Sequence, residues 1–73
     1  MMPYKDKYLV TFYDGFEHSF YADNIRDLLD VVDDEEIMNP LEVNRALIYD
    51  STCIKDITFI GVFNVLTGRR ISE

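Results

Sequence analysis

The 73-residue sequence predicts a small two-layer α+β domain, and three features of its pattern support that prediction. Two runs of β-branched and aromatic residues flank Asp14-Gly15, an amphipathic segment follows, and a long apolar run lies near the C-terminus. This order predicts a β-hairpin, a helix and two further strands (ββαββ), with a β-grasp-like topology as one candidate. The chain is 48% hydrophobic and no linker or repeat divides it, so we expect one domain over residues 1–73.

The hairpin lies within YLVTFYDGFEHSFYA, residues 8–22. A three-residue loop, Tyr13–Gly15, pairs Phe12 with Phe16 and puts Gly15 at the left-handed position. A two-residue loop would mix apolar and polar side chains on each face, because a one-residue slip moves every side chain to the other face. We therefore predict the longer loop. The apolar face then holds Tyr8, Val10, Phe12, Phe16, His18, Phe20 and Ala22, and the other face holds Leu9, Thr11, Glu17, Ser19 and Tyr21.

A helix is predicted from about Asn24 to Asp33, with Asp23 as its N-cap. Its apolar residues recur at i, i+3, i+4 and i+7, which is typical of one buried helix face. The helix should end in DEEIMNP, because acidic residues oppose the dipole at a helix C-terminus and Pro40 disfavours helical angles in the residue before it. The apolar stripe consists of Ile25, Leu28, Leu29 and Val32.

The C-terminal half is less regular in its pattern. Residues 40–48 suit either a short second helix or a strand, and we favour a turn or a short helical turn followed by a strand over about Arg45 to Asp50. The run from Ile57 to Leu66 could form a helix, but Gly61 and the β-branched residues around it favour a strand. A turn at Thr67-Gly68 should end that strand, and Arg69–Ile71 begins a short edge segment.

The net charge of −7 is concentrated in one segment. Eight acidic residues and a single Arg26 lie between Asp23 and Glu42, whereas acids and bases cancel in the rest of the chain. Such a protein should repel nucleic acid and anionic membranes and attract basic proteins. We therefore expect a protein partner, and no direct binding to nucleic acid or to a membrane.

Three interpretations of the acidic segment follow. As the solvated outer face of the helix it keeps a small protein soluble. As a nucleic-acid mimic it presents carboxylates about 5–6 Å apart along the helix, comparable with phosphate spacings, and blocks a basic nucleic-acid-binding enzyme, as small acidic proteins of phages do. A calcium loop is disfavoured because its alternating ligands and central glycine are missing, so we expect no metal. The candidate residues are Asp23, Asp27, Asp30, Asp33, Asp34, Glu35 and Glu36.

A second candidate surface is apolar. Strict alternation over Ile57 to Leu66 gives apolar residues on both faces of the strand, yet one short helix covers only one face of a sheet. Either a second helix over residues 40–48 packs on the remaining face, or another chain does, most simply a second copy. The residues expected on this face are Leu9, Tyr21, Ile60, Val62 and Leu66.

Nothing in the sequence predicts catalysis. His18 is the only histidine and lies on the apolar face of the hairpin, so we expect a structural role for it. Cys53 is the only cysteine, so we expect an incidental thiol and a reducing, cytoplasmic location, the more so because the first apolar run is too short for a signal peptide. Arg69 and Arg70 alone do not make a nucleic-acid patch.

These observations predict a small, non-catalytic protein-interaction module without a cofactor. Self-association through the apolar sheet face is the first hypothesis, so a homodimer is expected. Inhibition of a nucleic-acid-binding enzyme through the acidic helix is the alternative.

Overall fold

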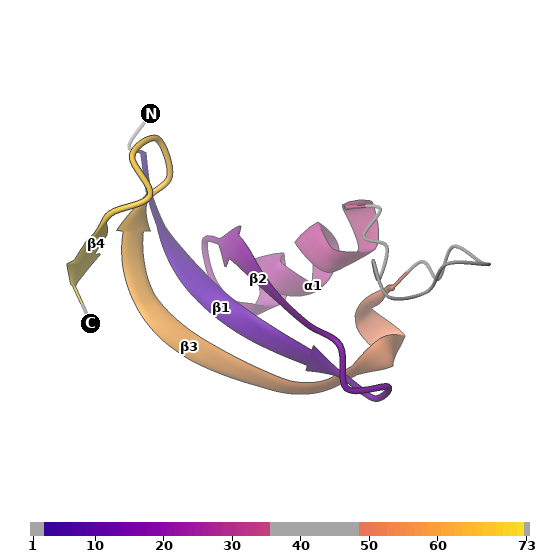
Figure 1. Ribbon diagram of the computed structural model, residues 1–73. Helices are drawn as coiled ribbons and strands as arrows, with labels where there is room; N and C mark the ends of the chain where they lie inside the picture. The colour runs from indigo at the N-terminus through magenta and orange to yellow at the C-terminus, as the bar shows by residue number, and fades with distance from the viewer. Residues whose placement is uncertain (1–2, 36–48, 73) are drawn as a thin grey trace.

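The computed structural model describes residues 3–35 and 49–72. Within these ranges four strands form one antiparallel sheet in the order β2-β1-β3-β4, and helix α1 packs on one face of it. The long strands β1 and β3 are curved, and α1 lies on their concave side (Figure 1). The elements are β1 Tyr4–Phe12, β2 Glu17–Ala22, α1 Ile25–Asp34, a 3-10 turn Ser51–Cys53, β3 Ile54–Asn64 and β4 Arg70–Ser72. The α+β class and the ββαββ order are confirmed.

The second pair of strands differs from the prediction. The strand expected over residues 45–50 falls partly outside the described residues, and Tyr49 and Asp50 are not in a strand. The fourth strand is instead β4, where only a short edge segment was expected. The helix considered for residues 40–48 also lies outside the described part of the chain.

The sheet also differs from a β-grasp sheet. A β-grasp sheet has its first and last strands side by side and parallel at its centre. Here the central pair is β1 and β3, and these strands run antiparallel.

The hairpin has the predicted three-residue loop. The N–H of Phe12 donates to the Phe16 carbonyl at 2.8 Å, and the N–H of Gly15 donates back to the Phe12 carbonyl at 2.9 Å. Gly15 has a φ of 92°, the left-handed conformation that this loop requires. The pairing continues without interruption to Asp6 opposite Ala22, so the predicted faces are confirmed.

The helix begins one residue later than predicted, and its N-cap is Asn24. The Asn24 side chain accepts a hydrogen bond from the Asp27 N–H at 2.8 Å, and the Asp27 carboxylate accepts one from the Asp23 N–H at 2.9 Å. A cap at Asp23 would put Arg26 at the third helical position, where it could not accept the return hydrogen bond. These two hydrogen bonds therefore explain why Asn24, and not Asp23, is the N-cap.

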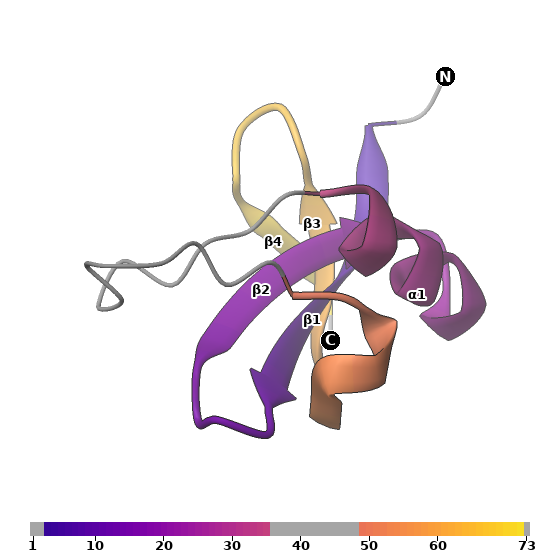
Figure 2. The ribbon, with the colours of Figure 1, turned by 90° about the vertical axis from the view of Figure 1, so that its right-hand side faces the viewer.

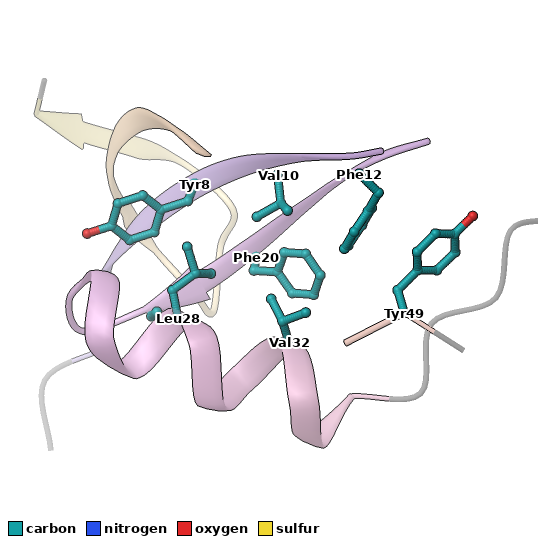
Figure 3. Close-up of a cluster of buried hydrophobic side chains, with 8 residues drawn as sticks. Tyr8, Val10, Phe12, Phe20, Leu28, Val32 and Tyr49 are labelled. Atoms are coloured by element: carbon teal, nitrogen blue, oxygen red, sulfur yellow. The ribbon is translucent and has the colours of Figure 1, made fainter. Parts of the chain in front are cut away.

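The core lies between α1 and the concave face of the hairpin (Figure 3). Leu28 and Val32 of the helix are fully buried against inward side chains of β1 and β2. The two other residues of the predicted apolar stripe remain open, with Ile25 56% and Leu29 38% exposed. Only half of the predicted stripe is thus core. The buried hydrophobic residues are Tyr8, Val10, Phe12, Phe20, Ala22, Leu28, Val32 and Tyr49.

Two irregularities change the face of the sheet on which the side chains of β3 lie. Its pairing with β1 shifts between Lys7 and Tyr8, where Ile60 is the extra residue, and shifts again between Thr11 and Phe12. Gly61 follows the first irregularity with a φ of 146°, a backbone conformation that side-chain-bearing residues rarely adopt. Such bulges bend a strand and increase its twist, which fits the curvature of β3.

Candidate functional site

The acidic residues of α1 divide into two groups. Asp23 and Asp27 take part in hydrogen bonds at the start of the helix, and Asp23 also lies 3.7 Å from Lys5 Nζ. Asp33 joins α1 to the 3-10 turn, because it accepts hydrogen bonds from the Ser51 N–H at 2.8 Å and from the Ser51 hydroxyl at 3.2 Å. The carboxylates of Asp27 and Asp33 therefore have structural roles, whereas that of Asp23 forms only an exposed ion pair.

The second group is exposed and carries no such contact. Asp30, Asp34 and Glu35 are exposed, and within residues 3–35 and 49–72 none of their side chains forms a hydrogen bond or an ion pair. Glu36, the last member of the predicted stripe, lies outside the described residues. The free part of the acidic stripe is thus smaller than the sequence suggested.

The predicted apolar face is split between the two faces of the sheet. Leu9 lies opposite Thr58 on the face away from the helix, and Tyr21 shares that face. Val62 lies opposite Asp6, whose side chain is on the same face as Tyr8, so Val62 is on the helix side. The cause is the bulge at Ile60, because one extra residue reverses the alternation that follows it. Leu66 belongs to neither face, since it is 82% exposed in the turn after β3.

The face away from the helix, the outer face, is mixed rather than apolar. Lys7 Nζ lies 5.3 Å from the ring centre of Tyr21 and 4.8 Å from that of Phe63, and the two rings are 6.3 Å apart. The ammonium group therefore covers both rings with a cation–π contact. Nearby, the Thr11 hydroxyl donates to Glu17 at 3.1 Å. An antiparallel sheet with one solvated face commonly has this mixed character.

Apolar exposure is instead found on the helix side, over β3. Phe59 pairs with Tyr8 and shares its face, and their rings are 5.6 Å apart. Tyr8 is buried, yet Phe59 is 49% exposed. The reason is the position of α1, which packs chiefly against β2, so that no α-helix of the described residues covers this side of β3. The open apolar surface of β3 is thus on the helix side, and not on the outer face, where the sequence analysis expected it.

The exposed apolar residues of α1 lie on the side of the helix that faces β3. Ile25, Leu29 and Asp33 recur every four residues, so they form one row along the helix. Asp33 bonds Ser51, in the 3-10 turn that leads directly into β3. Figure 2 shows α1 and this turn on the same side of the strands. We call the four residues that border the uncovered part of this face the inner strip: Ile25, Leu29, Phe59 and Val62.

The remaining polar residues form no catalytic arrangement within the described residues. His18 is exposed between Phe16 and Phe20, its Nδ1 lies 2.8 Å from the Ser19 carbonyl oxygen, and no carboxylate of the described residues pairs with its ring. Asp50 accepts a hydrogen bond from the Cys53 thiol, at 3.5 Å, and one from the Thr52 N–H. The hydrogen bond from the Thr52 hydroxyl is the main cause that lowers the pKa of Asp50. These contacts are those of a capped turn.

The described residues hold no cluster of histidine, cysteine and acidic side chains suited to a metal ion. Their one α-helix is too short to cross a membrane.

Comparison with protein-family models, with curated proteins and with solved structures finds no match for this chain.

Proposed function

We propose that this protein is a small, non-catalytic interaction module that binds another protein through its inner strip, most simply a second copy of itself. The observation that carries the proposal is the exposure of Phe59. This side chain lies on the same face as the core and contacts Tyr8, yet about half of its surface is open (49%). Burial of a large apolar side chain contributes roughly 1.5–3 kcal/mol, so a partner that covers Phe59 gains stability from it.

Two further features support the proposal. Ile25 and Leu29 expose apolar surface on α1, which packs on the same face of the sheet, so the open surface comes from two elements. Aromatic side chains that are exposed in this way are enriched at the centres of protein interfaces.

Analytical ultracentrifugation over a concentration series tests self-association. We expect the wild-type chain to form a dimer and Phe59→Ser to shift the equilibrium to the monomer. Tyr13→Ser is the matched control, because Tyr13 is 72% exposed in the hairpin loop, away from the inner strip. A wild-type chain that stays monomeric would exclude the second copy as partner.

Affinity capture from lysate of the source cells then tests other protein partners. The proposal expects a partner that survives high salt and that the Phe59→Ser bait no longer captures. If both baits capture the same proteins, the inner strip is not the binding surface.

The alternative function is inhibition of a nucleic-acid-binding enzyme by charge mimicry. The specific observation in its favour is that Asp30, Asp34 and Glu35 are exposed and that their side chains form no hydrogen bond or ion pair with other described residues. A carboxylate that replaces a phosphate must be accessible to the basic side chains of the enzyme that it blocks. A carboxylate that only stabilises the fold has no such requirement.

A double substitution that removes two negative charges from α1 tests the alternative function. Asp30→Asn with Asp34→Asn leaves the capping contacts of Asn24 intact and should abolish a salt-sensitive interaction. Asp56→Asn, an exposed acid on β3, is the control for charge removal on another surface. Binding that survives the double substitution in a folded protein contradicts mimicry.

A further inference from the structure

The space over β3 has the width of one α-helix. Neighbouring strands are about 4.8 Å apart, so β3, two positions from β2 in the sheet, lies about 10 Å from it. Helices that pack side by side have axes about 8–10 Å apart. A second helix over β3 would therefore contact α1, which packs against β2, at an ordinary packing distance.

The surfaces that would receive such a helix are apolar on two sides. The floor is formed by Phe59 and the half-buried Val62 of β3, and the wall by Ile25 and Leu29 of α1. Ile25 and Leu29 are four residues apart, so they form a ridge that runs along α1. A ridge with this spacing fits the groove between side chains of a neighbouring helix.

The charge beside the inner strip is negative. Asp33 lies in the same row as Leu29, Asp30 is exposed farther round the helix, and Arg26, the only base of α1, lies between them, so two acids flank the strip against one base. Lys5 and Lys7 alternate with the inward side chains of β1, so they belong to the outer face, and Lys7 covers the rings of Tyr21 and Phe63 there. They therefore do not offset the acids beside the strip.

We propose that the inner strip receives a basic amphipathic α-helix of a partner protein, whose apolar stripe covers Phe59 and Leu29 and whose lysines or arginines face the acids of α1. The inference rests on the proposed function, since it names the partner class for the same surface. A basic helix adds charge attraction to this apolar contact, because the chain carries a net charge of −7.

The test is an NMR titration of the ¹⁵N-labelled full chain with three synthetic peptides of about 14 residues. The first places leucine at helical spacing among lysines, the second has the same composition in shuffled order, and the third replaces the lysines by glutamates. We expect the first peptide to shift the amide signals of Leu29 and Phe59, and to bind at least about tenfold more tightly than the other two. Phe59→Ser should weaken its binding about tenfold, and Tyr13→Ser should leave it unchanged.

The outcomes separate this inference from the proposed function. Equal binding of the ordered and shuffled basic peptides, with shifts confined to residues around Asp30 and Asp34, means simple charge attraction and overturns the inference. If no peptide binds but the chain forms a dimer that Phe59→Ser disrupts, the helical partner is wrong and the interaction module stands. If Phe59→Ser changes neither peptide binding, nor self-association, nor the affinity capture of proteins from lysate, then both the helical partner and the interaction module are wrong. Far-ultraviolet circular dichroism confirms that each variant is folded before it is used.

Discussion

The hydroxyl of Tyr49 donates a 2.5 Å hydrogen bond to Asp14 Oδ2, and so joins the segment after the helix to the hairpin loop, 35 residues earlier in the chain. The Tyr49 ring lies 4.4 Å from that of Phe12 and 5.1 Å from that of Phe16. Tyr49 therefore closes the open end of the core, where β1 and β2 extend beyond α1. A tyrosine suits this place because its ring is buried while its hydroxyl reaches a carboxylate at the surface.

The first prediction concerns the pH dependence of this contact. The hydrogen bond from Tyr49, together with one from the Phe16 N–H, lowers the pKa of Asp14 below its usual value. Because the folded-state pKa is depressed, the contact stabilises the native state at neutral pH and that contribution is lost as the pH falls through the folded-state pKa. We expect Tyr49→Phe to lower the thermal unfolding midpoint at about pH 7 and to have a smaller effect at about pH 2. An equal shift at both pH values would show that Asp14 is not the group that responds.

The second prediction identifies the helix cap. Asn24→Ala should reduce the free energy of unfolding by about 1 kcal/mol, because the Asp27 N–H loses its acceptor. Asp23→Ala removes only an exposed contact with Lys5, so it should cost less. Asn24→Asp retains a capping oxygen and should restore most of the loss. Urea denaturation of the three variants checks this order, and a larger loss for Asp23→Ala would assign the cap to Asp23.

The elements that the sequence predicts best are those whose signals are local. The hairpin register follows from side-chain alternation and from one glycine, so both the loop and the two faces are confirmed. The helix is confirmed for the same reason, because four apolar residues recur at its period. Its cap is off by one residue, since Asp23 and Asn24 are both good caps and the decision rests on which residue stands three positions later.

The features that the sequence did not predict depend on contacts between distant residues. Alternation along β3 assumes an unbroken strand, and the bulge at Ile60 is visible only in its pairing with Lys7 and Tyr8. Gly61 is the one local signal of that bulge, because a glycine inside a strand often marks one. The exposure of Ile25 and Leu29 could not be predicted from the sequence either, because it depends on α1 packing over β2 rather than over the middle of the sheet.

The third prediction concerns the hairpin loop. Gly15 has a φ of 92°, and an added Cβ would meet no atom within 4 Å. Gly15→Ala is therefore expected to destabilise the protein by backbone strain alone, by about 1 kcal/mol. Gly15→Asn should cost less, because asparagine tolerates the left-handed region better than alanine does. Chemical denaturation measures both, and equal losses would argue against strain as the cause.

The last prediction separates the buried face of α1 from the face that borders the inner strip. Leu28 is fully buried, so Leu28→Ala should reduce the free energy of unfolding by about 3 kcal/mol through lost burial and the cavity that remains. Leu29 is 38% exposed and lies beside it in the sequence, so Leu29→Ala should cost less than about 1 kcal/mol. Urea denaturation of the isolated chain gives both values. If Leu29→Ala proves as costly as Leu28→Ala, then Leu29 is already covered in the free protein, and the inner strip would not be open to a partner.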